Sequence, residues 1–254
     1  SDLGGKTWTN VTPPTSPKFN MMNSIDVNPF LRGGAYVVAT SYKFGDNTPY
    51  IYRTTDYGKT WTVITNGIPK EEFVRVVRAD PKRQGLLYAG TEKGMWISLD
   101  DGANWNRFQL NLPPVPIHDL AIRNDNLVAA THGRGFWMVD DLTPLHQVNV
   151  EMNSKEAVLF KPLAAYRMAG GAGERNPKTE GENHPGGAII HYYVKSVDEK
   201  TEVKLEILEQ DGKLIRAYSN KAKEKSEQLT VKSGGNRFVW NLRYPGYKTF
   251  PGMV

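Results

Sequence analysis

The chain has 254 residues, 39% of them hydrophobic and 23% charged, which are proportions of a globular protein with room for one large or two ordinary domains. Its net charge of +5 is not gathered into a basic block, which argues against a nucleic-acid partner. Cysteine is absent, so disulfides, thiol nucleophiles and cysteine metal sites are excluded, and no apolar run of about 18 residues predicts a membrane span. We expect neither a metal nor a cofactor, because the histidines are scattered and no phosphate-loop or metalloprotease motif occurs.

A repeated strand pattern fills the first part of the chain. Each repeat has an apolar strand, a polar turn, a strand ending in Ala or Gly plus Thr, a loop, and a strand with an aromatic residue. The equivalent threonines are Thr40, Thr91 and Thr131. Alternation dominates over helical periodicity, and four short strands in roughly 45 residues are typical of a β-propeller blade. The repeats cover residues 25–61, 77–105 and 120–141.

The first thirteen residues, SDLGGKTWTNVTP, are interpreted as the outer strand of a preceding blade. They depart from the later repeats, because Leu3 stands where those have Asp. Three repeats do not close a propeller, which needs roughly 4–8 blades. We therefore expect an all-β chain that begins with a partial propeller, truncated at both ends, and whose remaining blades come from a missing part of the parent protein.

Two turns share a hydroxyl residue, an Asp, a Gly and a Trp at fixed spacing. The Asp carboxylate accepts hydrogen bonds from backbone N–H groups, the Gly permits a positive φ, and the Trp buries a large surface. These properties favour a structural role over catalysis, and Asp141 falls at the matching place in the third repeat. The residues are Thr54, Asp56, Gly58 and Trp61 in one copy and Ser98, Asp100, Gly102 and Trp105 in the other.

These residues resemble the Asp box, or BNR repeat, of sialidases, sortilin-type receptors and xyloglucan-cleaving enzymes. In those families the turn joins the third and fourth strands of a blade, on the rim opposite the usual binding face. The resemblance therefore implies an architecture and does not name a substrate.

Candidate ligand-binding residues lie in the loops that join second to third strands, which share one face with the loops between blades. His132 is suited to act as a general base or as a donor to a sugar, and Arg134 to hold a carboxylate. The alternative is that both bond to the backbone of neighbouring blades. The candidates on this face are His132, Arg134, Tyr42, Lys43, Glu92 and Lys93.

The pattern changes after residue 148. A connecting segment over 149–187 includes the Gly-rich stretch 168–177, which predicts a mobile linker. Alternating runs then predict an immunoglobulin-like or fibronectin-like sandwich over 188–254, incomplete because about seven strands are usual. The domain assignment is thus 1–148 for the blades, 149–187 for the connection and 188–254 for the sandwich. The predicted strands are 188–196, 202–209, 213–219, 227–232 and 236–244.

The combined order resembles the C-terminal half of sortilin-like "glycosyl hydrolase" proteins of the Bacteroidetes type. The quoted stretches are ATHGRGFWMVDDLTPLHQ, LFKPLAAYR, LEILEQDGKLIRAYS and NRFVWNLRYPG. The resemblance implies an exported protein, periplasmic, surface-bound or secreted. In that family the hydrolase name largely reflects shared Asp boxes, so no catalytic residue carries over.

Three functions remain open at this point. The first is a module that binds a glycan or a protein. The second is a glycoside hydrolase, xyloglucanase-like or sialidase-like, which commonly needs two carboxylates about 5–10 Å apart. The third is sortilin-type peptide binding. No sequence spacing pairs any two of the available carboxylates, and no FRIP-like sialidase segment occurs, so no catalytic residue is identified. The available carboxylates are Glu71, Glu72, Glu92, Asp119 and Asp141.

Overall fold

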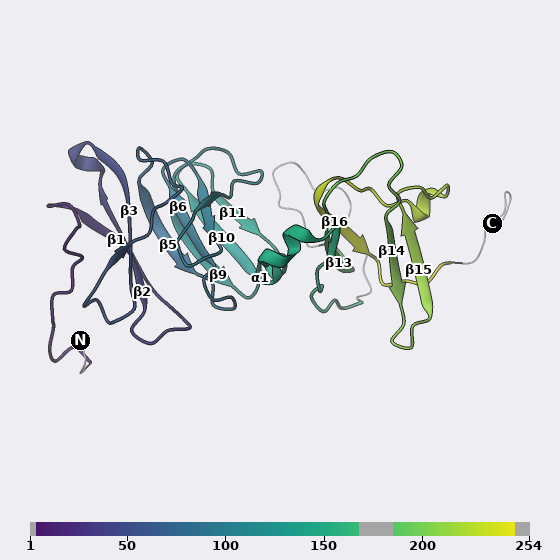
Figure 1. Ribbon diagram of the computed structural model, residues 1–254, viewed down its shortest axis with the longest axis horizontal. Helices are drawn as coiled ribbons and strands as arrows, with labels where there is room; N and C mark the ends of the chain where they lie inside the picture. Colours follow the sequence, from purple (N-terminus) through teal and green to yellow (C-terminus); the bar gives the residue numbers. More distant parts are fainter. Residues whose placement is uncertain (1–3, 168–184, 247–254) are drawn as a thin grey trace. The chain divides into compact units, whose positions relative to one another are not determined.

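The computed structural model describes residues 4–167 and 185–246, and the chain divides into two compact units, residues 1–142 and 143–254 (Figure 1). Leu3 and the predicted linker over 168–177 lie outside the described residues. The regular secondary structure of the described part is nearly all β-strand, as predicted. Its helices are α1 (Thr143–Gln147) and the 3-10 turns η1 (Tyr42–Phe44), η2 (Val150–Ser154) and η3 (Lys225–Glu227). None of these helices is long and apolar enough to cross a bilayer.

The first unit holds two four-stranded antiparallel sheets with the strand order of propeller blades, each strand pairing with the next in the chain. The first blade is β1 (Met21–Val27), β2 (Ala35–Ser41), β3 (Asp46–Thr54) and β4 (Thr62–Val63). The second is β5 (Val74–Ala79), β6 (Leu87–Thr91), β7 (Met95–Ser98) and β8 (Asn106–Arg107). The predicted repeats are therefore blades.

The third blade has three strands, β9 (Ile117–Arg123), β10 (Asn126–Thr131) and β11 (Phe136–Val139). After β11 the chain passes Asp140–Asp141 and enters α1 at Thr143, so no fourth strand pairs with β11 among the described residues. The third copy of the turn, expected at Asp141, is consequently not followed by the short outer strand that follows the other two.

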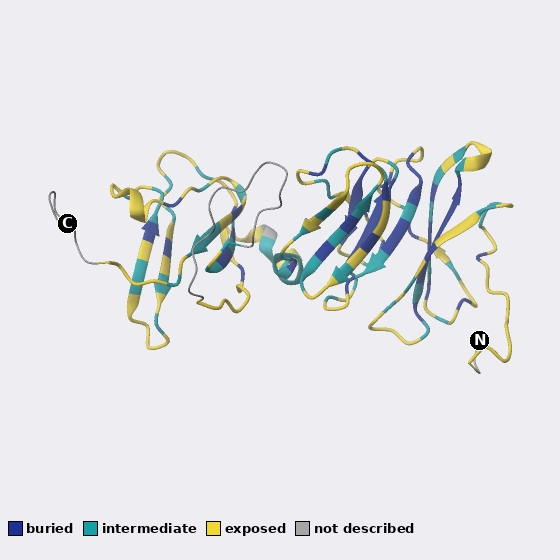
Figure 2. Cartoon of the chain, turned by 180° about the vertical axis from the view of Figure 1, so that it is seen from behind, coloured by how far each residue is buried: buried dark blue, intermediate teal, exposed yellow. Residues whose placement is uncertain are grey.

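Apolar side chains between the blades form the core of the first unit. One cluster joins Tyr36 and Ile51 of the first blade to Val77 and Trp96 of the second, all of them buried. The middle strands β2 and β6 are buried along nearly their whole length, and Figure 2 shows them in dark blue. Strands buried on both faces explain the near-continuous apolar runs in this part of the sequence.

The two turns that contain Asp, Gly and Trp join β3 to β4 and β7 to β8; we call them the Asp–Gly–Trp turns. In the second turn, Ser98 Oγ donates to Asp100 and accepts from the Gly102 N–H, at 2.8 and 2.9 Å. Gly102 has a φ of +86°, which glycine adopts without strain. The Trp105 indole N–H then donates to the Ile64 carbonyl of the preceding blade at 2.7 Å. The turn therefore fastens one blade to the blade before it.

The second unit contains two small sheets that pack on a shared apolar core. One sheet has the order β12 (Ala157–Leu159), β13 (Ala188–Val194), β16 (Gly234–Trp240), and the other pairs β14 (Lys204–Leu208) with β15 (Leu214–Ser219). The strand predicted over 227–232 is not formed. That segment instead follows η3 and buries Leu229 against Tyr192 and Tyr218, so its apolar residues serve packing without a continuous ladder.

Candidate ligand-binding face

The blades present two opposite ends. In an antiparallel blade the first strand begins where the second ends and the third begins. We call this end the top face; it carries the loops between β2 and β3, β6 and β7, and β10 and β11. The Asp–Gly–Trp turns lie at the other end, which we call the bottom face.

An aromatic pair and an ion pair meet on the top face, between the first and second blades. The rings of Tyr42 and Phe73 stack with centroids 4.7 Å apart. The guanidinium of Arg75, at the start of β5, lies 5.3 Å from the Tyr42 ring and 4.9 Å from the Phe73 ring, within the range of cation–π attraction. Its Nε and Nη2 atoms both contact Glu92 Oε2, at 2.8 and 2.7 Å. The Arg75 side chain is 15% exposed, so this cation is held in one orientation.

Two hydrogen-bonding atoms of this ion pair remain available. Both contacts use Oε2 of Glu92. The other carboxylate oxygen, Oε1, has no hydrogen-bond partner within residues 4–167 and 185–246, and Nη1 of Arg75 has none there either. The top face thus offers an acceptor and a donor that belong to one ion pair, next to stacked aromatic rings.

A histidine pair from the third blade extends the same cluster. His132 Nδ1 and His118 Nε2 lie 3.2 Å apart, so one imidazole donates to the other. His118 stands at the start of β9 and His132 in the loop after β10, and both are exposed. We call the full set the top-face cluster; it consists of Tyr42, Phe73, Arg75, Glu92, His118 and His132.

The histidine pair predicts a pH dependence. Burial lowers the pKa of His118, the positive charges of Arg75 and His132 lower it further, and Glu92 opposes them. At pH values just below about 6.5, the folded chain therefore binds fewer protons at His118 than the unfolded chain does. The contribution of His118 to the free energy of unfolding is full above that pH, and it is lost as the pH falls through the pKa of His118 in the folded chain. An NMR titration should show His118 with a depressed pKa that rises in His132→Gln. An unchanged pKa in that variant would contradict the pairing.

The structure brings together three of the six predicted top-face residues. Tyr42, Glu92 and His132 belong to the top-face cluster. Lys43 is exposed and makes no hydrogen bond or ion pair to a described residue. Lys93 and Arg134 form hydrogen bonds with described residues only through their own backbone atoms. Sequence reasoning missed Phe73, Arg75 and His118. Their one signal was position, since each lies at or just before the start of a blade's first strand.

Two further aromatic rings are exposed on the same face. Phe44, two residues after Tyr42, is 69% exposed, and Phe19, just before β1, is 83% exposed. Their ring centroids are 6.2 Å apart. Exposed rings of this kind offer apolar faces against which the C–H face of a ligand can pack.

Two carboxylates near the top face, Glu72 and Asp119, lie against arginines. Glu72 is 2% exposed and accepts from the Trp96 indole N–H at 2.9 Å and from Arg107 at 3.2 Å. Asp119 lies 2.6 Å from Arg78. Both carboxylates are therefore held in ion pairs with arginines.

The carboxylates of the Asp–Gly–Trp turns are committed to their own turns. Hydrogen bonds from the backbone and the hydroxyl of Thr60, at 2.9 and 2.7 Å, lower the pKa of Asp56 to about 2. Burial opposes the shift at Asp100, yet bonds from Asn104 lower its pKa as well. Both side chains are held by hydrogen bonds within their own turns, at the end of the blades away from the top-face cluster.

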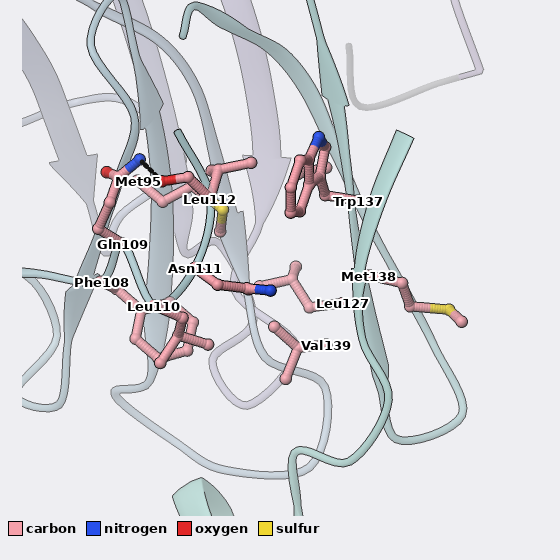
Figure 3. Close-up of a pocket in the computed structure, with 11 residues that line it drawn as sticks. Met95, Phe108, Gln109, Leu110, Asn111, Leu112, Leu127, Trp137, Met138 and Val139 are labelled. Carbon is pink, nitrogen blue, oxygen red and sulfur yellow. Dashed lines mark hydrogen bonds between the residues drawn. The ribbon is translucent and has the colours of Figure 1, made fainter. Parts of the chain in front are cut away.

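A cavity also lies between the second and third blades, but it is small and apolar. It measures about 30 Å³ and is lined by Met95, Leu127, Trp137 and neighbouring side chains (Figure 3). The Gln109 amide closes one side by donating to the Leu112 carbonyl at 2.7 Å (Figure 3). This volume has room for about one water molecule and none for a sugar or a peptide. The cavity is a packing gap between blades.

Comparison with known proteins gives short or distant likenesses, and no family model matches the chain. A vacuolar protein sorting/targeting protein 10 from Leptosphaeria maculans is 30% identical over 67 residues, which are 26% of this chain and 4% of that protein. The structure of YCF48 bound to D1 peptide matches with a TM-score of 0.40 and 21% identity, over 54% of this chain and 42% of that one. A GH74 enzyme from Niastella koreensis matches with a TM-score of 0.38 and 16% identity, over 68% of this chain and 28% of that one.

This chain therefore spans less than half of the length of each of these three proteins. With TM-scores this low, the assignment of blades depends on the strand order and register of the chain's own sheets.

Proposed function

We propose that the three blades belong to a β-propeller binding module whose top-face cluster holds a glycan. The observation that carries this proposal is the pair of available atoms on Arg75 and Glu92. A sugar carries neighbouring hydroxyl groups that both donate and accept, so one hydroxyl can accept from Nη1 while the next donates to Oε1. The stacked Tyr42 and Phe73 rings fix the guanidinium, and exposed Phe44 offers a ring for the apolar face of a sugar.

A glycan is favoured over a peptide by the balance of charge. Arg75 and Glu92 neutralise each other, so the centre of the top-face cluster has little net attraction for a charged terminus. It offers directional donors and acceptors instead, which suit uncharged hydroxyl groups. Binding is favoured over glycoside hydrolysis because Glu72, Glu92 and Asp119 are each engaged in an ion pair with an arginine.

The finer assignments made from the sequence belong to the same proposal. The exported location, the Asp-box family and an immunoglobulin-like identity for the second unit are supported by the resemblances given above. The packing of two antiparallel sheets on one core in the second unit is compatible with a sandwich of that kind.

Replacement of Arg75, the central cation of the top-face cluster, should weaken binding. We expect Arg75→Ala to weaken binding of the recognised polysaccharide by about tenfold or more, since it deletes a partly buried, oriented donor and leaves Glu92 unpaired. Isothermal titration over a panel that includes xyloglucan and sialosides measures the loss. Glu92→Gln, which keeps the shape of the side chain, should also weaken binding.

Arg53→Ala is the matched control, because Arg53 forms a similar ion pair with Asp101, 2.7 Å away, beside an Asp–Gly–Trp turn. It should bind as the unaltered chain does. Equal affinity of all three variants would place the ligand elsewhere. Release of reducing sugar by the same samples would instead establish hydrolysis.

A further inference from the structure

A second cavity lies within the second unit, and it is large enough for a small ligand. It measures about 510 Å³, against about 30 Å³ for the gap between the second and third blades. Cavities that hold small molecules typically measure about 300–1,000 Å³. The neighbouring strands β13 and β16 line it, together with the segment that precedes β16 (Figure 1). Every described residue that lines it belongs to the second unit, and we call it the second-unit cavity.

Strand pairing places the residues of one wall. His191 on β13 lies directly opposite Arg237 on β16, so both side chains are on the same face of the sheet. Phe160, just after β12, donates its N–H to the His191 carbonyl at 3.0 Å and is itself buried. An apolar residue and a cation therefore line the same cavity, both held by the pairing of this sheet.

A buried amide fixes the wall beside β16. Asn236 is 8% exposed, and its Oδ1 accepts from the Lys232 N–H at 2.8 Å. Its Nδ2 donates to the carbonyls of Lys232 and Gly234, at 2.8 and 2.9 Å. Both backbone polar groups of Lys232 are thus fixed by one side chain. A ligand that enters the second-unit cavity has little loop ordering to offset.

The charge of the second-unit cavity is positive. Arg237 and Lys232 both line it, and none of the described lining residues is an Asp or a Glu. Neither cation forms an ion pair or a side-chain hydrogen bond with any residue in 4–167 or 185–246, whereas other lysines of this unit lie against glutamates. Cations without a carboxylate partner, on the walls of one hollow, attract an anion.

We propose that the second-unit cavity binds a small organic anion that carries a carboxylate or a phosphate group, at a site separate from the top-face cluster. The planar guanidinium of Arg237 matches two oxygens of either group, and Lys232 adds a second positive charge. Phe160 provides an apolar surface for the carbon part of the ligand. The top-face cluster, in contrast, is centred on an arginine that a glutamate already neutralises.

The test is an NMR titration of the isotope-labelled 254-residue chain with glucose 6-phosphate, glucuronate and glucose. These probes share a sugar ring and differ in the charged group. We expect saturable shifts of the Gly235 and His191 amide resonances with at least one charged probe and none with glucose. The relative affinities of the two charged probes distinguish a phosphate from a carboxylate ligand. Added salt should weaken binding, because the cations are exposed.

Variants separate the cavity from general charge. Arg237→Gln should weaken binding of the charged probe by about tenfold or more, and Lys232→Gln by a smaller factor, since a lysine binds as a point charge. Lys223→Gln and Arg243→Gln are the matched controls, because each removes one positive charge from the same unit outside the cavity. Both controls should bind as the unaltered chain does.

Gly235→Val tests the cavity without a change of charge. Gly235 lines the cavity, and nothing lies within 4 Å of an added Cβ, so the new side chain enters open space. It should abolish binding while thermal denaturation shows an intact fold.

Three results would overturn the proposal. They are the absence of saturable shifts with both charged probes, equal shifts with glucose, and an equal loss of affinity in the two control variants. Shifts confined to the top-face cluster would also overturn it, because the anion would then bind there. The proposed glycan binding at the top face is measured on other residues, so either proposal can fail without the other.

Discussion

Replacing Trp105 with alanine is expected to lower the free energy of unfolding of the first unit by about 3–5 kcal/mol. The indole is 3% exposed and packs in the core shared by the first two blades. Its N–H also donates to the Ile64 carbonyl, which the variant leaves unsatisfied. Urea denaturation followed by far-ultraviolet circular dichroism measures the change without relying on tryptophan fluorescence.

Trp61 provides the matched control, because it holds the same place in the other Asp–Gly–Trp turn and makes the same kind of bond, to the Val11 carbonyl. It is only half-buried, so Trp61→Ala should cost about 1–2 kcal/mol. Similar losses for both variants, or a loss below about 1 kcal/mol for Trp105→Ala, would contradict the claim that the second turn fastens two blades.

Replacing Gly67 with alanine is the second large expected effect. Gly67 has a φ of +100°, and an added Cβ would lie 2.3 Å from the backbone oxygen of Trp105. The backbone conformation costs about 1–3 kcal/mol for a residue with a side chain, and forced repacking against the neighbouring backbone adds about 1–3 kcal/mol. We expect a loss of about 2–6 kcal/mol by the same denaturation measurement.

Gly45→Ala separates the two contributions. Gly45 also has a positive φ, +80°, but nothing lies within 4 Å of the added Cβ. Its replacement should cost about 1–2 kcal/mol from the backbone term. If Gly67→Ala lowered the free energy of unfolding no more than Gly45→Ala does, the claim that the two blades approach closely at Trp105 would be contradicted.

The blades could be predicted from the sequence because their signals are local. Alternating strands, the threonines at or next to the ends of the second strands, and the spacing of Asp, Gly and Trp all lie within one repeat. The third blade's missing fourth strand was harder to foresee. Asp141 fits the repeated pattern, but the segment after it contains Pro144 and starts a helix, and a helix cannot supply the outer ladder.

The top-face cluster could be predicted only in part, because its contacts form between blades. Loop position was enough to single out Tyr42, Glu92 and His132. Arg75 and Phe73 sit at the start of an ordinary alternating strand, and nothing local distinguishes Arg75 from Arg78, which instead bonds to the Leu120 carbonyl. His118 became recognisable once the third blade placed it 3.2 Å from His132.

In the second unit the prediction of a strand over 227–232 was wrong because strand pairing, like the contacts between blades, cannot be read from a local pattern. Its alternation is real, and Leu229 is buried as the pattern requires. However, burial of alternate residues needs only an extended segment and does not require a paired neighbour. The single bridge from Ser219 to Gln228 is all the ladder that the described residues form there.

The most direct test of the account is to map ligand contacts by NMR on the isotope-labelled 254-residue chain, titrated with the polysaccharide fragments selected by calorimetry. The account predicts that the resonances which shift belong to Tyr42, Arg75, Glu92 and His118, and that those of Asp56 and Asp100 stay unchanged. Binding accompanied by shifts in the second unit, or at the Asp–Gly–Trp turns, with the top-face cluster unaffected, would contradict it.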